Sequence, residues 1–390
     1  MIGARRIYTV AMNKFVFAFL GLLGGLSLCV ADSRAAAPAN PVLSIPVPIW
    51  SEESIGPGGT LNDVAVDSAG NPHVLYVDMA AEELRYARRV DGAWVVTPLG
   101  PFPVGSPPPD MVLDLAIDPT NDEPVVAYSN IERNSLYVGR PNEGVWWFER
   151  LDDIGQLLSL RVDPAGDAHL VYVRGSRIAY TYQVGGVWHR ETIGEPVDAM
   201  WNLSMDLDSA GFPHVAWSGS SGSFHAQRLG PNAWDITTLP ASELRQVISL
   251  AVDPADRPHF LVMKVELGHG WPPYSRITLL LAEHTGGSWE FTPLWQAYDW
   301  GVDARLVAGA DGSLHVAYYD SDARPHYDVV DPDGRLSHDQ PFDRGQGQMR
   351  LAPGTDGRPF ISHFDGHTLF LSRQGIALHD RLIFGPAALR

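Results

Sequence analysis

The sequence contains a single cysteine, Cys29, close to its N-terminus. We expect this residue to leave with an N-terminal leader, so that the mature chain has no thiol. A chain without thiols has no disulfide, no zinc–thiolate site and no cysteine nucleophile. We predict neither a metal nor a cofactor for the mature protein.

Positive charge is also scarce. The formal net charge is −18, and lysine occurs only at Lys14 and Lys264. Loss of residues 1–31 would remove Arg5, Arg6 and Lys14 and no acidic residue, taking the net charge to −21. A protein this acidic repels phosphate backbones and anionic membrane surfaces. We therefore predict that neither nucleic acid nor a membrane is a partner.

Long apolar runs are missing apart from residues 15–30. Basic residues followed by an apolar run of this length are typical of a signal peptide, and the run is too short to favour a membrane-spanning helix. We predict a signal peptide over residues 1–31, with cleavage after Ala31 or after Ala39. Residues 40–390 then form one domain.

Two details of the leader stay open. Translation could begin at Met12. Cys29 raises the alternative of a lipid anchor, but Leu28 is bulkier than the small residue that a lipoprotein site has before its cysteine. We expect export without an anchor, to the periplasm or the medium, as a monomer.

One turn motif recurs seven times along the chain. Its first copy runs from Val64 to Tyr76, and successive copies follow at intervals of 45–56 residues, as the spacing of these equivalents shows: Asp67, Asp118, Asp163, Asp208, Asp253, Gly309 and Gly354. Each copy reads as four short strands, over 61–67, 73–78, 84–88 and 94–99 in the first, and no helical pattern intervenes. This pattern predicts an all-β fold, a seven-bladed β-propeller of four-stranded antiparallel blades.

Aromatic residues recur at fixed strand positions. They are, on the second strand, Tyr76, Tyr128, Tyr172, Trp217 and Tyr318; on the third, Tyr86, Tyr137, Tyr180, His225, Tyr327 and Phe370; on the fourth, Trp94, Trp146, Trp188, Trp234 and Trp289. Large rings fill the gap of about 10 Å between stacked sheets. We interpret these residues as wedges between neighbouring blades.

The N-terminal stretch Trp50–Gly56 repeats the fourth-strand pattern of Trp188–Gly194, while the seventh repeat has no tryptophan at its own end. We predict that the N-terminal stretch supplies the outer strand of the last blade, which closes the ring. The alternative is that residues 376–384 fill this place and leave Trp50 on an edge.

Two recurring polar positions have structural explanations. Asp67 followed by Gly70 suits a tight hairpin, because the carboxylate can accept backbone N–H bonds and glycine tolerates a positive φ. Five histidines share one second-strand position: His73, His169, His214, His259 and His315. Equivalent positions on different blades point apart, so these imidazoles cannot converge on one metal ion. We predict that each braces its hairpin, for example through the repeat aspartate.

The first strands should line the central channel. One polar position on them differs between blades, being Asp63, Asp114, Ser159, Ser204, Ser249, Arg305 and Arg350 in chain order. Two acids thus lie across the ring closure from two arginines. Two interpretations remain: an ion-pair network that joins the first and last blades, and a polar channel mouth that binds ligand.

Two aromatic insertions break the period in repeats 5 and 6. The first contains His269, Trp271 and Tyr274, and the second contains Trp295, Tyr298, Asp299 and Trp300. Both connections should emerge on the same face of a propeller. Tryptophan and tyrosine rings beside polar groups suit a saccharide platform. Ordinary loop packing is the competing explanation.

The segment Val64–Asn71 resembles the hairpin of NHL-type propeller repeats, and the resemblance extends over residues 45–385. NHL-like propellers serve mainly as binding platforms and occasionally as lyases. The Gly70–Val74 segment is also similar to strands of propeller polysaccharide lyases, but no catalytic motif of theirs matches this chain. Sialidases differ in the spacing of their Asp boxes, which carry a tryptophan that is missing after Gly70.

We predict a non-catalytic binding propeller for glycan or protein ligands. Its site would comprise the loops of blades 5 and 6 and the channel mouth, with the residues Trp271, Tyr274, Trp295, Tyr298, Trp300, Asp63, Asp114, Arg305 and Arg350. The alternative is a carbohydrate-active enzyme, a lyase or hydrolase, that draws an acid/base pair from His269, Tyr298, Asp299 and Asp303.

Overall fold

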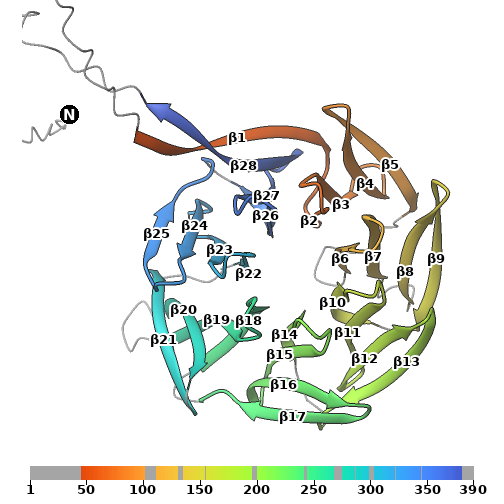
Figure 1. Ribbon diagram of the computed structural model, residues 1–390, viewed down its shortest axis with the longest axis vertical. Coiled ribbons are helices and arrows are strands. Elements are labelled where there is room, and N and C mark those ends of the chain that lie inside the picture. Colours follow the sequence, from red (N-terminus) through yellow and green to blue (C-terminus); the bar gives the residue numbers. More distant parts are fainter. Residues whose placement is uncertain are drawn as a thin grey trace, which may run out of the picture. The chain divides into compact units, whose positions relative to one another are not determined.

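The structure, a computed structural model, describes residues 45–101, 111–130, 135–153, 155–195, 200–240, 244–267, 275–285, 287–297, 303–320, 322–343 and 345–379. Seven four-stranded antiparallel sheets stand side by side in a closed ring, as Figure 1 shows, which confirms the predicted seven-bladed β-propeller. Within the described ranges there is no helix long and apolar enough to span a bilayer.

The blades follow one another along the chain. Blade 1 contains β2 (Asn62–Val66), β3 (Pro72–Asp78), β4 (Glu83–Val90) and β5 (Ala93–Pro101); blade 2 contains β6 (Met111–Asp118), β7 (Glu123–Asn130), β8 (Ser135–Asn142) and β9 (Val145–Asp152); blade 3 contains β10 (Gln156–Val162), β11 (Ala168–Arg174), β12 (Arg177–Val184) and β13 (Val187–Ile193). Blade 4 contains β14 (Met200–Leu207), β15 (Pro213–Gly219), β16 (Gly222–Gly230) and β17 (Ala233–Thr238); blade 5 contains β18 (Leu244–Val252), β19 (Pro258–Leu267), β20 (Ser275–Thr285) and β21 (Ser288–Ala297). Blade 6 contains β22 (Ala304–Ala308), β23 (Leu314–Tyr319), β24 (Pro325–Val330) and β25 (Leu336–Asp339); blade 7 contains β26 (Gln346–Pro353), β27 (Pro359–Phe364), β28 (Thr368–His379) and β1 (Ile45–Pro57).

The first strand of each blade lies nearest the axis (Figure 1). Its recurrent aliphatic residue is buried in every blade: Val64, Leu115, Leu160, Met205, Leu250, Leu306 and Leu351. Apolar side chains of adjacent blades form shared clusters, and one of them joins Val171 and Ile178 of blade 3 to Met205 and Val215 of blade 4. Burial between blades is therefore what holds the ring together.

The N-terminal strand closes the last blade, as the tryptophan pattern predicted. β1 pairs antiparallel with β28 from Ile45 opposite His379 to Pro57 opposite Thr368. Trp50 is not left on a bare edge, because its ring meets Tyr327 of blade 6 edge-on at 5.3 Å and its Nε1 donates to Asp339 at 2.7 Å. The closing strand thus also contacts the preceding blade.

Other tryptophans of the outer strands act as the predicted wedges. Trp146 of blade 2 meets Tyr86 of blade 1 edge-on at 5.2 Å, and Trp234 of blade 4 meets Tyr180 of blade 3 at 5.3 Å. Edge-on packing of this kind adds to the stabilisation that the buried area supplies. The recurring aromatic positions are therefore explained by contact between blades.

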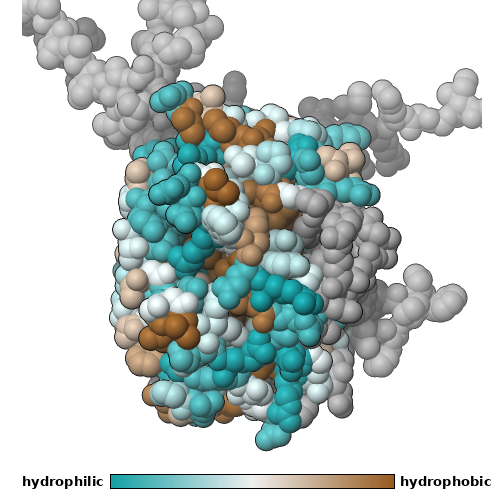
Figure 2. All heavy atoms as spheres, turned by 90° about the vertical axis from the view of Figure 1, so that its right-hand side faces the viewer, coloured by the Kyte–Doolittle hydropathy of each residue, from teal (hydrophilic) through white to brown (hydrophobic). Residues whose placement is uncertain are grey.

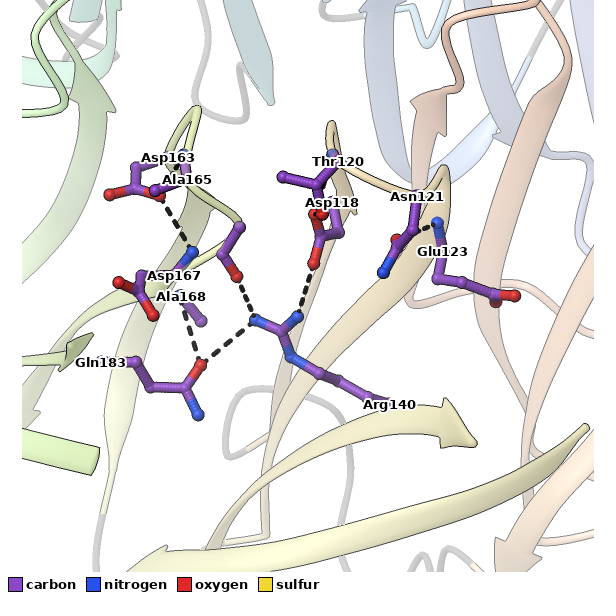
Figure 3. Close-up of polar contacts among 11 residues, drawn as sticks. Asp118, Thr120, Asn121, Glu123, Arg140, Asp163, Ala165, Asp167, Ala168 and Gln183 are labelled. Atoms are coloured by element: carbon purple, nitrogen blue, oxygen red, sulfur yellow. Dashed lines mark hydrogen bonds and ion pairs between the residues drawn. The ribbon is translucent and has the colours of Figure 1, made fainter. Parts of the chain in front are cut away.

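The repeated turns stabilise one face of the ring. Asp67 Oδ1 accepts the N–H of Asn71 at 2.7 Å, and Gly70 has a φ of +82°, as the turn motif predicted. Figure 3 shows a link between two such turns, in which Arg140 donates to Asp118 of blade 2 at 2.8 Å and to the carbonyl of Gly166 in blade 3 at 3.0 Å. The polar groups of these turns satisfy one another.

Three of the five second-strand histidines, His73, His259 and His315, hydrogen-bond to their turns, as predicted. Nε2 of the other two, His169 and His214, lies 3.4 and 3.9 Å from the repeat aspartate and makes no hydrogen bond with the described residues. His73 lies 3.3 Å from Asp67 through Nε2 and 2.5 Å from the hydroxyl of Tyr86 through Nδ1. Burial lowers the pKa of His73, which keeps the imidazole neutral. A neutral ring in this place donates from Nε2 to the carboxylate and accepts the tyrosine hydroxyl at Nδ1, since a carboxylate only accepts.

The outer strands β5, β9 and β13 form the side of the ring that faces the viewer in Figure 2. Hydrophobic spheres lie there in separate spots among hydrophilic ones. The most exposed large apolar side chain of the described residues, Trp147 on β9, has 67% of its surface accessible. Scattered apolar side chains of this kind are normal on a protein surface.

Candidate functional site

The inner strands enclose a cavity of about 600 Å³ along the axis of the ring. Its charged lining comes from six of the seven blades: the carboxylates are Asp63, Asp114, Asp206 and Asp303, and the guanidinium groups are Arg161, Arg305 and Arg350. The predicted channel position therefore does face a cavity large enough for a small ligand.

The channel position also has a structural role. Asp63 accepts the N–H of Leu115 at 2.8 Å, so a side chain of blade 1 satisfies a backbone donor of blade 2. Asp114 does the same for Leu160 at 2.8 Å. Serines continue the series for Met205, Leu250 and Leu306, through Ser159 at 3.3 Å, Ser204 at 3.1 Å and Ser249 at 3.1 Å.

This series explains why the position is polar. Inner strands lack a neighbour on the axis side, so some of their N–H groups need a partner from outside the blade. Aspartate and serine oxygens can accept these bonds, whereas a guanidinium can only donate. The series therefore stops at Arg305 and Arg350, and in blade 7 the N–H of Met349 donates instead to Asp303 at 2.9 Å.

Two carboxyl groups converge in blades 1 and 2. The N–H of Leu115 donates both to Asp63 at 2.8 Å and to Asp114 at 2.9 Å. Burial, followed by the charge of Asp114, raises the pKa of Asp63 well above its usual range. Two neighbouring carboxyl groups that share a donor resist ionising together, which favours a proton on one of them.

Replacing Asp63 by Asn should remove a pH-dependent loss of stability. In the unfolded chain Asp63 ionises near its ordinary pKa, while the folded state holds the proton to higher pH. Stability therefore falls as the pH rises from about 4 through the raised pKa, and the variant lacks this slope because its amide does not titrate. Urea unfolding at about pH 4.5 and 8 should show the wild type losing stability relative to Asp63→Asn. An equal slope in both proteins, with exposed Asp235→Asn as the control, would exclude the raised pKa.

The direct ion pairs expected across the closure are not formed. Among the described residues, no oxygen of Asp63 or Asp114 lies within 4.0 Å of a nitrogen of Arg305 or Arg350. Arg350 leans back to blade 6 and pairs with Asp303 at 3.2 Å, while Asp63 leans forward to blade 2. The side chains of Asp63 and Arg350 thus point away from each other. Hydrogen bonds to backbone N–H groups take the place of the ion-pair network expected between the first and last blades.

A different ion pair crosses the channel wall between blades 3 and 4. Arg161 Nε lies 3.0 Å from Asp206 Oδ1, and the other oxygen of Asp206 accepts the N–H of Val252 at 2.8 Å. This pair was not predicted from the sequence, although the repeat alignment contains a pattern that indicates it. Both residues stand two positions before the repeat aspartate, where the other blades have only Ala or Val: Ala65, Ala116, Ala251, Val307 and Ala352.

Arg305 differs from the other two arginines of the channel. Its one hydrogen bond among the described residues is a long one of 3.4 Å to the carbonyl of Ala304. No carboxylate of the described chain lies within 4.0 Å of it, and burial together with Arg350 lowers the pKa of Arg305. Most N–H donors of this half-buried guanidinium therefore have no partner among the described residues.

The predicted aromatic platform is only partly described. Trp271, Tyr274, Tyr298 and Trp300, together with His269 and Asp299, lie outside the described residues, so their roles stay predictions. Trp295 lies within β21 instead of a loop, and it packs on Tyr318 of blade 6 at 5.7 Å. Blade packing thus explains Trp295 without a ligand.

An exposed tryptophan at the start of an inner strand was not singled out from the sequence. Trp201 is 45% exposed and lies at an irregular point of the β14 pairing, between Met200 and Asn202. Such bulges re-aim side chains and are frequent beside functional sites. Asn202 lines the cavity, so Trp201 stands next to it.

Within the described ranges, no three His, Cys, Asp or Glu side chains come together in a way that could hold a metal ion. Nδ1 of each of the five second-strand histidines contacts a third-strand side chain of its own blade. His259, for example, lies 3.1 Å from Asp253 and 2.8 Å from Glu283.

Solved structures share the ring. A streptogramin B lyase aligns with a TM-score of 0.57 at 10% identity, over 84% of this chain and 98% of that one. A catalytically inactive virginiamycin B lyase from Staphylococcus aureus, with quinupristin, gives 0.53 at 12% over 84% and 99%, and YCF48 bound to D1 peptide gives 0.53 at 15% over 87% and 96%. No protein-family model and no curated protein matches the sequence. At such identities the likeness shows that this chain is a β-propeller and leaves its activity open.

Proposed function

We propose that this chain is an exported, non-catalytic binding propeller for a glycan or protein ligand. The observation that carries the proposal is the axial cavity of about 600 Å³ with charged side chains in its wall. Pockets with a few fixed polar groups are the usual sites of ligand recognition. The basic and apolar leader over residues 1–31 supports export.

We expect the ligand to bind from the end of the ring opposite the repeated turns. The turns are occupied by contacts between blades, such as those of Ser68 with Asp122 at 2.7 Å and of Ser209 with Asp256 at 2.8 Å. The described strand ends that flank the insertions of blades 5 and 6 lie at the other end, where the inner strands begin: Leu267, Ser275, Ala297 and Ala304. We infer that the ligand enters the channel at that end.

Known propellers of this fold have ligands of different classes. The virginiamycin B lyase structure contains quinupristin, and YCF48 is bound to the D1 peptide. The fold therefore accommodates ligands of more than one kind. Which ligand a given propeller binds depends on the side chains of its channel and loops.

Replacing both Trp271 and Trp300 by Ala should abolish ligand binding while the melting temperature changes by no more than a few degrees. Loop tryptophans that serve as binding anchors carry much of the binding energy, whereas loss of a core tryptophan typically costs about 3–5 kcal/mol of stability. A glycan array and a calorimetric titration with each hit measure the effect on the mature chain.

The matched control is Trp147→Ala, an exposed tryptophan on the outer strand β9, which should bind normally. Normal binding by the folded double variant would exclude the loops as the site. Unfolding of the double variant would show that these rings are core. An activity screen on uronic-acid polysaccharides tests the enzyme alternative, and turnover by the wild type would replace the binding proposal.

A further inference from the structure

The strongest unexplained feature of the channel is the guanidinium of Arg305. Arg161 has Asp206 at 3.0 Å and Arg350 has Asp303 at 3.2 Å, but Arg305 has no carboxylate within 4.0 Å among the described residues. A guanidinium carries five N–H donors, and leaving a half-buried charge unpaired costs free energy. An arginine in this state needs an acceptor from elsewhere.

The described carboxylates of the channel take part in other bonds, and none of them lies within 4.0 Å of Arg305. Asp303 already receives the N–H of Met349 at 2.9 Å and the guanidinium of Arg350. Asp63 and Asp114 receive the N–H groups of Leu115 and Leu160, each at 2.8 Å. Each of these carboxylates thus helps to join two blades through at least one of its oxygens.

Arg305 is also reachable by a solute, since it lines the cavity of about 600 Å³. Arg350, on the neighbouring blade, lines the same cavity and adds a second positive charge. We propose that the channel binds a saccharide that carries one carboxylate, such as a uronic acid, with the carboxylate on Arg305. This inference rests on the proposed binding function and specifies its ligand.

The chemistry of the wall favours this ligand class. The flat fork of a guanidinium matches the two oxygens of a carboxylate. Across the ring, β6 of blade 2 faces β22 of blade 6 (Figure 1). Asp114 on β6 lines the same cavity, and its carboxylate can accept hydrogen bonds from sugar hydroxyls. A net charge of −18 opposes a densely charged polyanion, so one anionic group per binding unit fits better.

The test is a calorimetric titration of the mature chain with D-galacturonic acid, with D-galactose as the neutral match and with sodium acetate as the free anion. We expect galacturonic acid to bind at least tenfold more tightly than either. Arg305→Leu should weaken this binding at least tenfold, and Arg305→Lys should fall between, because it keeps the charge and loses the fork. Surface Arg358→Leu, on the turn of blade 7, should bind as the wild type does.

A second readout does not depend on the ligand. Without ligand, Arg305→Leu should melt at or above the wild-type temperature, because an unpaired charge is removed. Arg161→Leu should melt lower, because it leaves Asp206 unpaired. A lower melting temperature for Arg305→Leu would show that Arg305 has a partner within the protein, and would overturn the inference.

The remaining outcomes separate the two proposals. Equal binding of galactose, or unchanged affinity in Arg305→Leu, would overturn the carboxylate site and leave the binding function standing. Acetate binding as tightly as galacturonic acid would overturn the saccharide class. If neither these sugars nor any glycan or protein probe binds the wild type, the proposed function itself fails.

Discussion

Deletion of residues 40–56 should lower the melting temperature by about 10 °C or more, or prevent folding. The deletion removes almost all of β1, whose pairing with β28 extends over the length of that strand. It also removes the buried side chain of Ile55 and the contacts of Trp50 with Tyr327 and Asp339. Losses of this kind add to several kcal/mol, and each kcal/mol shifts the melting temperature of a domain this size by about 2 °C or slightly more.

The matched control is a chain that begins at Ile45, which retains the whole of β1 and should melt close to the mature protein. Differential scanning calorimetry of both truncated chains measures the difference. A chain that begins at Pro57 and melts within about 2 °C of the control would show that β1 does not close the ring.

Glu191→Ala should destabilise the fold by about 3–5 kcal/mol, because it leaves a buried arginine unpaired. Glu191 is 4% exposed and accepts Arg228 at 2.7 Å and the indole N–H of Trp234 at 3.0 Å. Arg228 stacks over the ring of Tyr182 at 4.6 Å, so it cannot turn to water without losing that contact. Urea unfolding followed by tryptophan fluorescence measures the change.

The chain offers a control with a similar tryptophan contact at an exposed place. Glu149 accepts the indole N–H of Trp188 at 2.9 Å between blades 2 and 3, but this hydrogen bond is exposed and no arginine of the described residues pairs with Glu149. Glu149→Ala should therefore cost about 1 kcal/mol or less. Equal effects of the two substitutions would mean that the buried pair with Arg228 does not govern the contribution of Glu191.

The architecture was predictable because equivalent residues recur at equivalent strand positions in each repeat. The recurring turn aspartate fixed where each hairpin begins, and the missing tryptophan of the last repeat indicated that Trp50 belongs there. The histidine braces followed from splayed geometry and the chemistry of imidazole. Only the closure required a long-range contact, and the missing tryptophan of the last repeat indicated it. The other inferences followed from the local pattern that each blade repeats.

The site was harder to predict, because a residue type does not determine the direction in which its side chain leans. Asp63 and Arg350 stand on adjacent blades with opposite charges, yet each leans away from the other. The N–H of Leu115 attracts Asp63, and a strand pattern does not show which backbone donors lack partners. Trp295 was misplaced for a related reason, since β21 continues further than the repeat predicted.

The closing strand has a consequence for the order in which the molecule can be completed. β1 is the first described strand to leave the ribosome, and its partner β28 is the last. The first strand therefore stays unpaired until the whole chain has been made and, if it is exported, has crossed the membrane. Pairings this distant in sequence form slowly, and an unpaired strand is exposed to aggregation meanwhile. A nascent chain stalled before Thr368 would contain the inner strands of all seven blades but could not close the ring.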